Sequence, residues 1–353
     1  MRKTPLFEAH QSLGARLVDF AGWSLPQSFG SAIEEHVAVR TAAGVFDVSH
    51  MPIFEAEGKD AMALFLWALS CDLRQAKPQH AAYGCMLNEA GGILDDVLAY
   101  PEAEESVRLV ANAACEEKDF LWLSQIIASR GFDVKLRRYL DLAFVALQGP
   151  KAEDILASAL GEWTRAIPPF GFTCQENFFV SRTGYTGEDG YEISLPSALA
   201  HEFFLTLMHK GAKPCGLAAR DSLRVEAGFN LYGADMDESI TPMESGLSKV
   251  VDFTGRRAFS GKPSLARQRP RFCRLGIILE EKAMMRRGAV VRAAAEGVVT
   301  SAVYSPMLSA SIGFVRLPAG HGTGEAQVEV RGKWLAARVV KLPFVRRGRT
   351  KVR

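Results

Sequence analysis

A short apolar segment with two adjacent carboxylates constrains the fold of this chain more than any other feature. Residues 91–100 carry Asp95 and Asp96 among apolar side chains, and they follow a turn-forming run at 88–92. A second apolar run at 81–87 precedes the turn, so the pattern predicts a β-hairpin. The fold must then accommodate one carboxylate on each face of a single strand.

Strand geometry separates the two acids, because successive side chains point to opposite faces of a sheet. The expected faces are Leu94, Asp96, Leu98 and Tyr100 on one side, and Ile93, Asp95, Val97 and Ala99 on the other. A buried carboxylate costs free energy unless it is paired or protonated, and positions that bear this cost are often functional. The residues alone leave open whether the acids act in a site or only tie down the turn with backbone hydrogen bonds.

Length and composition indicate a globular protein of more than one domain. The chain has 353 residues, and 48% of its residues are hydrophobic, which is enough for a sizeable core. No apolar run approaches the ~20 residues that a membrane-spanning helix needs. The basic start at residues 1–4 has no apolar segment behind it, and no long Arg/Ser-rich leader follows. We therefore expect a cytoplasmic protein without membrane attachment.

The cysteines form neither a metal-binding nor a disulfide pattern. They are Cys71, Cys85, Cys115, Cys174, Cys215 and Cys273. No C-x-x-C pair occurs and no histidine lies at ligand spacing, so we expect no metal site and reduced, mostly buried thiols.

Charge is distributed unevenly along the chain. Residues 251–353 hold 21 Lys/Arg and 6 Asp/Glu, a net charge of +15, whereas residues 1–250 have a net charge of −13. The change predicts a domain boundary near residue 250 and a basic C-terminal part that attracts an anionic partner. Because no nucleic-acid module or stacking series of aromatics accompanies the basic residues, we expect a polyanionic small molecule or an acidic protein rather than nucleic acid.

Hydrophobic periodicity predicts an α+β region followed by a small β domain. Helices are expected at residues 31–43, 59–70, 118–129, 152–159, 197–210 and 218–228, the first with a Ser31/Glu34 capping box and an end at Gly44. Strands are expected at 45–57, 107–111, 144–148, 178–182 and 191–195. Beyond an Arg-rich stretch at 262–274 that prolines interrupt, strands are expected at 275–279, 288–292, 297–301, 310–316, 327–331 and 336–340. Their spacing indicates a β-barrel or sandwich.

Glu192 lies on the strand that follows a glycine-rich turn at 183–190. Gly190, Glu192 and Ser194 share one face of that strand. Small neighbours leave room for a ligand, whose paired N–H donors the carboxylate would bind. A solvated sheet edge is the commoner explanation for such a residue. The turn itself lacks the G-x-G-x-x-G spacing, so no dinucleotide site is expected.

Two arginines lie one turn apart on the helix expected at 218–228. Asp221 and Arg224 could form an ordinary surface pair, and Arg220 could hold a carboxylate at a buried site. The sequence does not choose between these uses.

Two further motifs favour structural interpretations. Residues 47–50 contain Asp, Ser and His, but adjacent strand residues face apart, so no catalytic triad is expected and His50 is expected in the core or in a supporting role. The acidic loop at 231–238 lacks the EF-hand spacing, and we expect its acids to cap a helix.

Together these motifs resemble the glycine cleavage T-protein family of tetrahydrofolate-dependent aminomethyltransferases. The segments that carry the resemblance are 4–6, 14–23, 46–51, 91–96, 112–114, 148–150, 181–192, 216–226, 231–238 and 305–306. No single segment is specific, but their number and order extend over essentially the whole chain.

The resemblance implies a three-lobed α+β fold with antiparallel sheets and a C-terminal β-barrel, in which tetrahydrofolate binds in a central hole. Two interwoven α+β lobes would occupy residues 1–260 and the barrel residues 270–345. The implied reaction transfers the methylene carbon from the aminomethyl-lipoyl H-protein of the glycine cleavage system to tetrahydrofolate. Its products are 5,10-methylenetetrahydrofolate, ammonia and dihydrolipoyl H-protein, and no metal takes part.

The resemblance also implies roles for individual residues. Asp96 matches the family's catalytic acid beside the reactive nitrogens of the folate, where a fixed carboxylate stabilises an iminium-like cation and orients the attacking nitrogen. Glu192 matches the acid that binds the pteridine ring through paired hydrogen bonds, and Arg220 matches an arginine at the same site. The positions that match the folate-pocket wall are Met51, Tyr83, Tyr100, Asn112 and Tyr185. Asp95 is then expected to be a structural residue that braces the turn.

Some positions depart from the family's pattern: Pro52 replaces a usual glycine, Cys71 a usual asparagine, and Phe229 a tyrosine of some relatives. Which basic residue of the tail closes the pocket stays open.

Two other functions remain as alternatives. One is a tetrahydrofolate-dependent demethylase of the same fold, and the other is a non-catalytic folate-binding assembly factor. Residues 237–247 lack the cysteine that marks the assembly factors, which argues against the second. No flavin domain precedes the motifs, so a fused oxidase is not expected.

Overall fold

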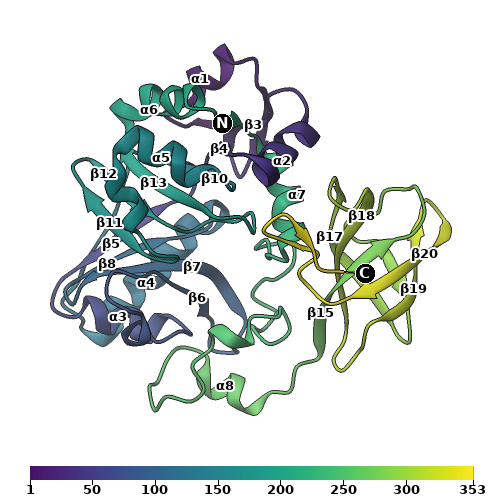
Figure 1. Ribbon diagram of the computed structural model, residues 1–353. Coiled ribbons are helices and arrows are strands. Elements are labelled where there is room, and N and C mark those ends of the chain that lie inside the picture. Colours follow the sequence, from purple (N-terminus) through teal and green to yellow (C-terminus); the bar gives the residue numbers. More distant parts are fainter. Residues whose placement is uncertain (353) are drawn as a thin grey trace.

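The computed structural model describes residues 1–352 and combines helices with mostly antiparallel sheets, followed by a barrel that stands to one side (Figure 1). The expected α+β fold with a C-terminal β-barrel is thereby confirmed. The chain begins with a small sheet of order β1-β3-β2, made of β1 (Arg2–Lys3), β2 (Arg16–Phe20) and β3 (Trp23–Ser28).

Helix α2 (Ala32–Thr41) follows this small sheet, and Ser31 caps it by accepting a hydrogen bond of 3.3 Å from the Glu34 amide. The helix ends at Thr41, two residues before the end expected at residue 43, and Gly44 begins the next strand, where it pairs with Gln148.

A six-stranded sheet of order β11-β12-β13-β10-β4-β14 forms the centre of the upper part in Figure 1. Its strands are β4 (Gly44–Asp47), β10 (Leu142–Gln148), β11 (Phe172–Gln175), β12 (Phe178–Ser181), β13 (Gly190–Pro196) and β14 (Lys213–Pro214). Helices α1 (Phe7–Ser12), α5 (Ala152–Leu160) and α6 (Ser197–His209) cover one face, where Val145, Ile193 and Phe204 are completely buried. Helix α7 (Leu217–Ala227) contributes Ala219 and Leu223 to the core on the other face.

A five-stranded antiparallel sheet of order β6-β7-β8-β5-β9 contains the predicted hairpin. Its strands are β5 (Ile53–Glu57), β6 (Ala82–Leu87), β7 (Ile93–Ala103), β8 (Ser106–Val110) and β9 (Lys135–Arg138), and helices α3 (Ala61–Ala68) and α4 (Glu116–Arg130) pack on it. The turn between β6 and β7 is closed by a 2.9 Å bond from the Asn88 amide to the Gly92 carbonyl. A Cβ at Gly92 would collide with the carbonyl oxygen of Glu238, so only glycine fits there. Short 3₁₀ turns occur at Leu73–Gln75, Ala113–Cys115, Glu162–Ala166 and Ser248–Val250.

One residue of β7 breaks the expected alternation. Leu87 pairs with Ile93, but Met86 pairs with Asp95, which leaves Leu94 as the extra residue of a β-bulge. Leu94 therefore joins Val97 in the core beneath α3 and α4, and Ile93 packs on the other side with Cys85. The predicted faces were wrong for these two residues because a pattern of alternation carries no signal for a bulge.

The predicted faces hold from Asp95 onward. Asp96 lies opposite Cys85, and Tyr83 lies opposite Leu98, in the uninterrupted register of the β6–β7 pair. Asp96, Leu98 and Tyr100 therefore share the face that points away from α3 and α4.

The C-terminal part is a closed barrel of order β15-β18-β17-β16-β19-β20, and the six expected strands are all present. They are β15 (Phe272–Leu279), β16 (Val290–Arg292), β17 (Glu296–Ser305), β18 (Ala310–Pro318), β19 (Gly324–Val330) and β20 (Lys333–Val340), followed by the hairpin β21 (Val345–Arg346) and β22 (Arg349–Thr350). The Arg-rich stretch before the barrel contains a helix that the prediction missed, α8 (Lys262–Arg267). Pro263 lies in its first turn, where a missing N–H breaks no helical bond.

Helix α7 is tied to the barrel by a buried ion pair. Arg224 is 3% exposed and contacts Asp235 at 2.7 Å, besides Asp221 at 2.8 Å. Asp235 also accepts hydrogen bonds from Thr300 (2.6 Å) and Ser301 (2.7 Å) on β17. The Asp221–Arg224 pair considered from the sequence is present and its acid is exposed, but Arg224 itself is buried and has Asp235 as a second, buried partner. The expectation of helix-capping acids at 231–238 was wrong, because Asp235 serves this buried network and no helix begins in the loop.

The two acids that share Arg224 provide a matched test. We expect Asp235→Asn to lower the free energy of unfolding by ~3 kcal/mol or more, because it leaves a buried guanidinium without its anion. Asp221→Asn removes an exposed partner of the same arginine and is expected to cost less than about 1 kcal/mol. Urea denaturation of both variants measures the difference, and equal losses would contradict the assigned role of Asp235.

Candidate active site

Asp96 is held by two donors on neighbouring strands. The Tyr83 hydroxyl on β6 donates to Asp96 Oδ2 at 2.8 Å, and Asn112 Nδ2, just after β8, donates to Asp96 Oδ1 at 3.0 Å. Both donors reach the carboxylate because β7 lies between β6 and β8 in the sheet. The structure thus brings together three of the residues named from the sequence.

The surroundings of Asp96 favour its protonated form. Burial, and secondly the adjacent Asp95, raise the pKa of Asp96 from 3.8 to about 7, while the hydrogen bonds from Tyr83 and Asn112 act in the opposite direction. A group with such a pKa changes its protonation state near neutral pH, as acid–base and charge-stabilising residues do.

Asp95 supports Asn112 rather than the hairpin turn. It is completely buried and accepts bonds from the Asn112 amide (3.0 Å) and from Asn112 Nδ2 (2.8 Å). The turn is instead tied by the Asn88 side chain, which accepts a 2.8 Å bond from the Gly92 amide. The structural role expected for Asp95 is present, but its expected partner was wrong.

Glu192 lies in the interior of a sheet and not at a solvated edge. Strand β13 lies between β12 and β10, and Glu192 is 4% exposed. Thr183 donates to Glu192 Oε2 at 2.6 Å, whereas Oε1 accepts no hydrogen bond from the described residues. Burial raises the pKa of Glu192, which Thr183 and Arg220 partly oppose. The carboxylate therefore has one oxygen left for a ligand.

Arg220 has no carboxylate within ion-pair distance among residues 1–352. Its guanidinium lies over the Tyr185 ring, 4.8 Å from the ring centroid, and Nη2 lies 3.8 Å from Met51 Sδ. Nη1 is buried without a hydrogen-bond partner, and burial lowers the pKa of Arg220. Since Asp221 pairs with Arg224, Arg220 remains available for an acceptor on a ligand.

The two other tyrosines named from the sequence differ in position. Tyr185 stacks on Phe229 with a centroid distance of 5.7 Å, and its hydroxyl donates to the Asn230 carbonyl. Tyr100 is completely buried, edge-on to Phe179 at 5.1 Å. Tyr100 therefore lies in the hydrophobic core, whereas Tyr185 lies beside Arg220.

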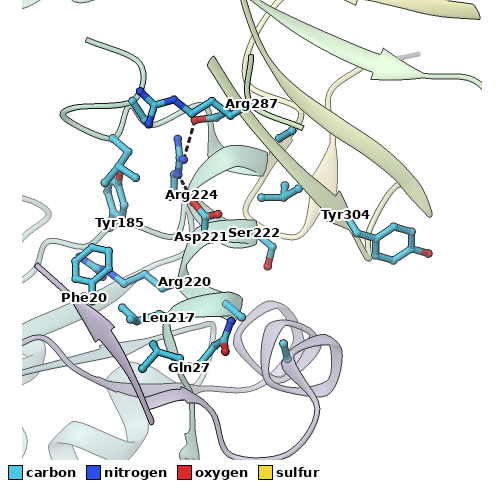
Figure 2. Close-up of a pocket in the computed structure, with 18 of the residues that line it drawn as sticks. Phe20, Gln27, Tyr185, Leu217, Arg220, Asp221, Ser222, Arg224, Arg287 and Tyr304 are labelled. Carbon is cyan, nitrogen blue, oxygen red and sulfur yellow. Dashed lines mark hydrogen bonds and ion pairs between the residues drawn. The ribbon is translucent and has the colours of Figure 1, made fainter. Parts of the chain in front are cut away.

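A cavity of about 730 Å³ opens beside α7, between the N-terminal sheet and strand β17 (Figure 2). Figure 2 shows Phe20, Tyr185 and Arg220 near one another on one side and Tyr304 on the other. A second cavity of about 560 Å³ is lined by Met51 and, like the first, by His50. Neither cavity is lined by Asp96 or Glu192. Both cavities therefore approach the site cluster, by which we mean Asp96, Glu192, Arg220 and Met51 with their partners, from the side of Arg220 and Met51.

His50 forms no triad with its neighbours in sequence. Asp47 bonds His10 at 2.7 Å, and Ser49 donates to the Phe144 carbonyl at 3.2 Å. Burial and the charge of Arg220 lower the pKa of His50 to about 4, so the ring is neutral at pH 7. The supporting role expected from the sequence agrees with this placement.

Thr183 and Arg274 belong to the cluster but were not named from the sequence. Thr183 positions Glu192, and its place as the first residue of the glycine-rich turn beside that strand could have indicated this. Arg274 on β15 donates to the Gly228 carbonyl at 3.0 Å, and burial lowers its pKa to about 10. Arg274 comes from the barrel, and no local pattern connects it to the site.

Behind the site, Asp95, Cys115 and Asp119 bring one donor atom each within 4.8 Å of one another. No spacing of these residue types along the chain predicts this cluster. Burial raises the pKa of the Cys115 thiol and that of Asp119, and protonated groups are poor ligands for a cation. All six cysteines are free thiols. Among residues 1–352, no helix combines the length and apolar character needed to cross a membrane.

Comparisons with known proteins agree along the whole chain. Residues 6–255 match the GCVT N-terminal domain family, and residues 271–346 match the glycine cleavage T-protein C-terminal barrel domain family. The chain is 44% identical to the aminomethyltransferase of Bordetella parapertussis and 42% identical to that of Burkholderia mallei, covering 99% of this chain and 98% of each relative. The crystal structure of the glycine cleavage system aminomethyltransferase T from Bartonella henselae matches with a TM-score of 0.92 at 35% identity, covering 99% of both chains.

The Tyr83 hydroxyl tests the electrostatics of Asp96. We expect Tyr83→Phe to raise the pKa of Asp96 above about 7, because it removes a hydrogen bond that favours the ionised form. Carboxylate titration followed by infrared spectroscopy, with Asp96→Asn to assign the band, measures the shift. Tyr100→Phe is the control, since the Tyr100 hydroxyl bonds Ser181 at 3.3 Å and not Asp96. An unchanged or lower pKa in Tyr83→Phe would refute the arrangement.

Proposed function

The chain belongs to the glycine cleavage T-protein family, and we propose that it is the aminomethyltransferase that passes the methylene carbon of aminomethyl-lipoyl H-protein to tetrahydrofolate. The products are 5,10-methylenetetrahydrofolate, ammonia and dihydrolipoyl H-protein. The observation that carries this proposal is the Asp96 carboxylate, which two donors hold on the inner face of β7.

The chemistry needs a fixed anion where positive charge develops. The carried carbon loses its amino group as ammonia and its bond to the lipoyl sulfur, while it forms bonds to two nitrogens of tetrahydrofolate. As the C–S bond breaks, the electron pair stays on the sulfur and the nitrogen-bound carbon takes on iminium-like charge, which Asp96 stabilises without having to reorient. Tyr83 and Asn112 hold the carboxylate in its orientation before the reaction begins, so the reaction step does not have to supply the free energy of ordering it. With a pKa of about 7, Asp96 is also suited to exchange a proton with a nitrogen of the substrates.

The cluster at Glu192 and Arg220 fits a flat, polar heterocycle. Glu192 Oε1 lacks a donor and Arg220 Nη1 lacks an acceptor, and a pteridine ring carries both N–H and carbonyl groups. When bound, tetrahydrofolate would supply the two nitrogens that receive the carbon. Glu192 and Arg220 would orient the ring, and Tyr185 with Met51 would cover its surface.

The second partner is the lipoyl-bearing H-protein. The basic C-terminal part, with its net charge of +15, supports docking of an acidic carrier or of the glutamate tail of the folate. The cavity beside α7 extends from the exposed Tyr304 on β17 to Arg220, and we infer that a carrier-borne arm approaches the site from this side.

The direct test of the activity is a comparison of donors. Turnover with aminomethylated H-protein and tetrahydrofolate is expected, and turnover with methylated amine or sulfonium donors is not. Efficient use of the methylated donors would favour the demethylase, and tight folate binding without any turnover would favour the assembly factor.

Asp96→Asn is expected to lower kcat by roughly 100-fold or more while leaving folate binding intact. The same variant is expected to unfold at a higher temperature at pH 8. The pKa of Asp96 is about 7 in the folded chain against an ordinary value of 3.8, so ionisation destabilises the fold as the pH rises from ~4 through 7. The gain in stability should therefore vanish below pH ~4.

Glu104→Gln, in the exposed turn between β7 and β8, is the control for both readouts and should change neither. Full turnover in Asp96→Asn would remove Asp96 from the mechanism.

Glu192→Gln is expected to raise the KM for tetrahydrofolate by roughly 10-fold or more, since hydrogen bonds to a charged group contribute about 1.5–3 kcal/mol. Tyr191→Phe is the matched control, because Tyr191 faces the opposite side of β13 and its hydroxyl has no partner. Equal KM values for the two variants in steady-state assays would argue against a ring-binding Glu192.

Binding of the carrier is expected to weaken from low to moderate salt, because screening reduces attraction between the basic C-terminal part and an acidic protein. Free aminomethyl-lipoamide lacks the protein's charge, and its apparent KM should change little over the same range. Apparent KM values that respond equally would contradict electrostatic docking of the carrier.

A further inference from the structure

Asp119 is a buried acid that the proposed chemistry does not use. It lies in the first turn of α4 and is 1% exposed, and neither of its oxygens receives a hydrogen bond from a described donor group. An ionised carboxylate in such a place would be strongly destabilising. The position requires either a proton on Asp119 or a change in its surroundings.

The surroundings offer a partner for that proton. One oxygen of Asp119, one oxygen of Asp95 and the Cys115 sulfur lie within 4.8 Å of one another. Both carboxyl groups are buried and they hydrogen-bond each other, which disfavours two negative charges, so the pair holds one proton. Asp95 is the better site for the remaining charge, because Asn112 donates two hydrogen bonds to it, whereas Asp119 receives none.

The other titratable groups around the pair do not change this assignment. Lys118 lies beside Asp119 on α4, but its ammonium is engaged by the Leu94 carbonyl (2.7 Å), the Tyr232 hydroxyl (2.7 Å) and Glu238 (3.1 Å). Asp96 on β7 interacts electrostatically with both acids, and Cys85 on β6 interacts with Asp95. Burial, and secondly Asp95, raise the pKa of Asp119 to about 10, which agrees with a protonated group.

We propose that Asp119 is a positioning residue for the transfer reaction. Its protonated carboxyl group donates a hydrogen bond to Asp95, and Asp95 in turn orients the Asn112 side chain that holds Asp96. The connection runs from Asp119 to Asp95, then through Asn112 Nδ2, which bonds Asp95 at 2.8 Å and Asp96 at 3.0 Å. The shared proton also leaves one negative charge instead of two behind Asp96. This inference rests on the proposed role of Asp96.

Two variants separate the donor function of Asp119 from its volume. Asp119→Asn keeps an N–H donor for Asp95, and Asp119→Leu removes the donor at similar size. In infrared difference spectra of the full chain at pH 8, wild type minus Asp119→Asn should show the C=O band of a protonated carboxylic acid. The titration midpoint of Asp96 should stay unchanged in Asp119→Asn.

In Asp119→Leu, Asp95 loses a hydrogen bond that favours its charged form, so Asp95 tends to take up a proton. The reduced charge beside Asp96 should then lower the Asp96 midpoint by roughly half a unit or more, and the acid limb of kcat/KM should move to lower pH with it. A purely structural Asp119 would leave both midpoints in place.

The proposal is overturned if the carboxylic acid band is absent, if both variants keep the wild-type midpoint of Asp96, or if native mass spectrometry finds a cation bound in the wild type but not in Asp119→Asn. If Asp119→Leu does not fold, the carboxylic acid band still shows whether Asp119 carries the proton, and a shifted Asp96 midpoint in Asp119→Asn would overturn the proposal. The infrared readouts need no turnover, so they also separate failure of this proposal from failure of the proposed function.

Discussion

Helix α7 must place two buried charged side chains, Arg224 and Glu226, and the half-buried Arg220 against three different neighbours, and the arrangement of the whole chain depends on it. Arg224 is neutralised by Asp235 at the barrel, and Glu226 by Arg40 of α2 at 2.9 Å. Arg220 is the exception, because its guanidinium meets a sulfur atom and a ring face but no carboxylate among residues 1–352. The two satisfied charges hold the helix in position, and they thereby present the unsatisfied one to the site.

The short-range features of the fold could be predicted from the sequence. Alternation in residues 95–100 placed Asp96 and Tyr100 on one face, and the turn at 88–92 predicted the hairpin. Leu94 and Ile93 were misplaced, because a bulge depends on the register with the partner strand. Helix α8 was missed because the arginines and prolines around it obscured its periodicity.

The candidate site was predictable only in part, because burial is decided by strands distant in sequence. From the sequence, Glu192 could lie on a solvated edge strand. Its burial becomes evident only when β10 and β12 are seen on either side of its strand. Arg274 comes from the barrel, and Asp119 approaches Asp95 only because α4 packs on the sheet. The resemblance to a family named Asp96 as the acid and Tyr83 and Asn112 among the pocket residues. The structure adds that both of these side chains hydrogen-bond Asp96.

The unsatisfied atoms at Arg220 and Glu192 have a consequence for the life of the protein in its cell. A ligand that satisfies both atoms binds only the folded chain and stabilises it, by about 2.7 kcal/mol at a concentration 100 times its Kd. The empty protein is then the form that opens more readily and that proteases attack first. The abundance of the protein is thereby coupled to the concentration of its ligand, because the ligand-bound form is degraded more slowly than the empty form.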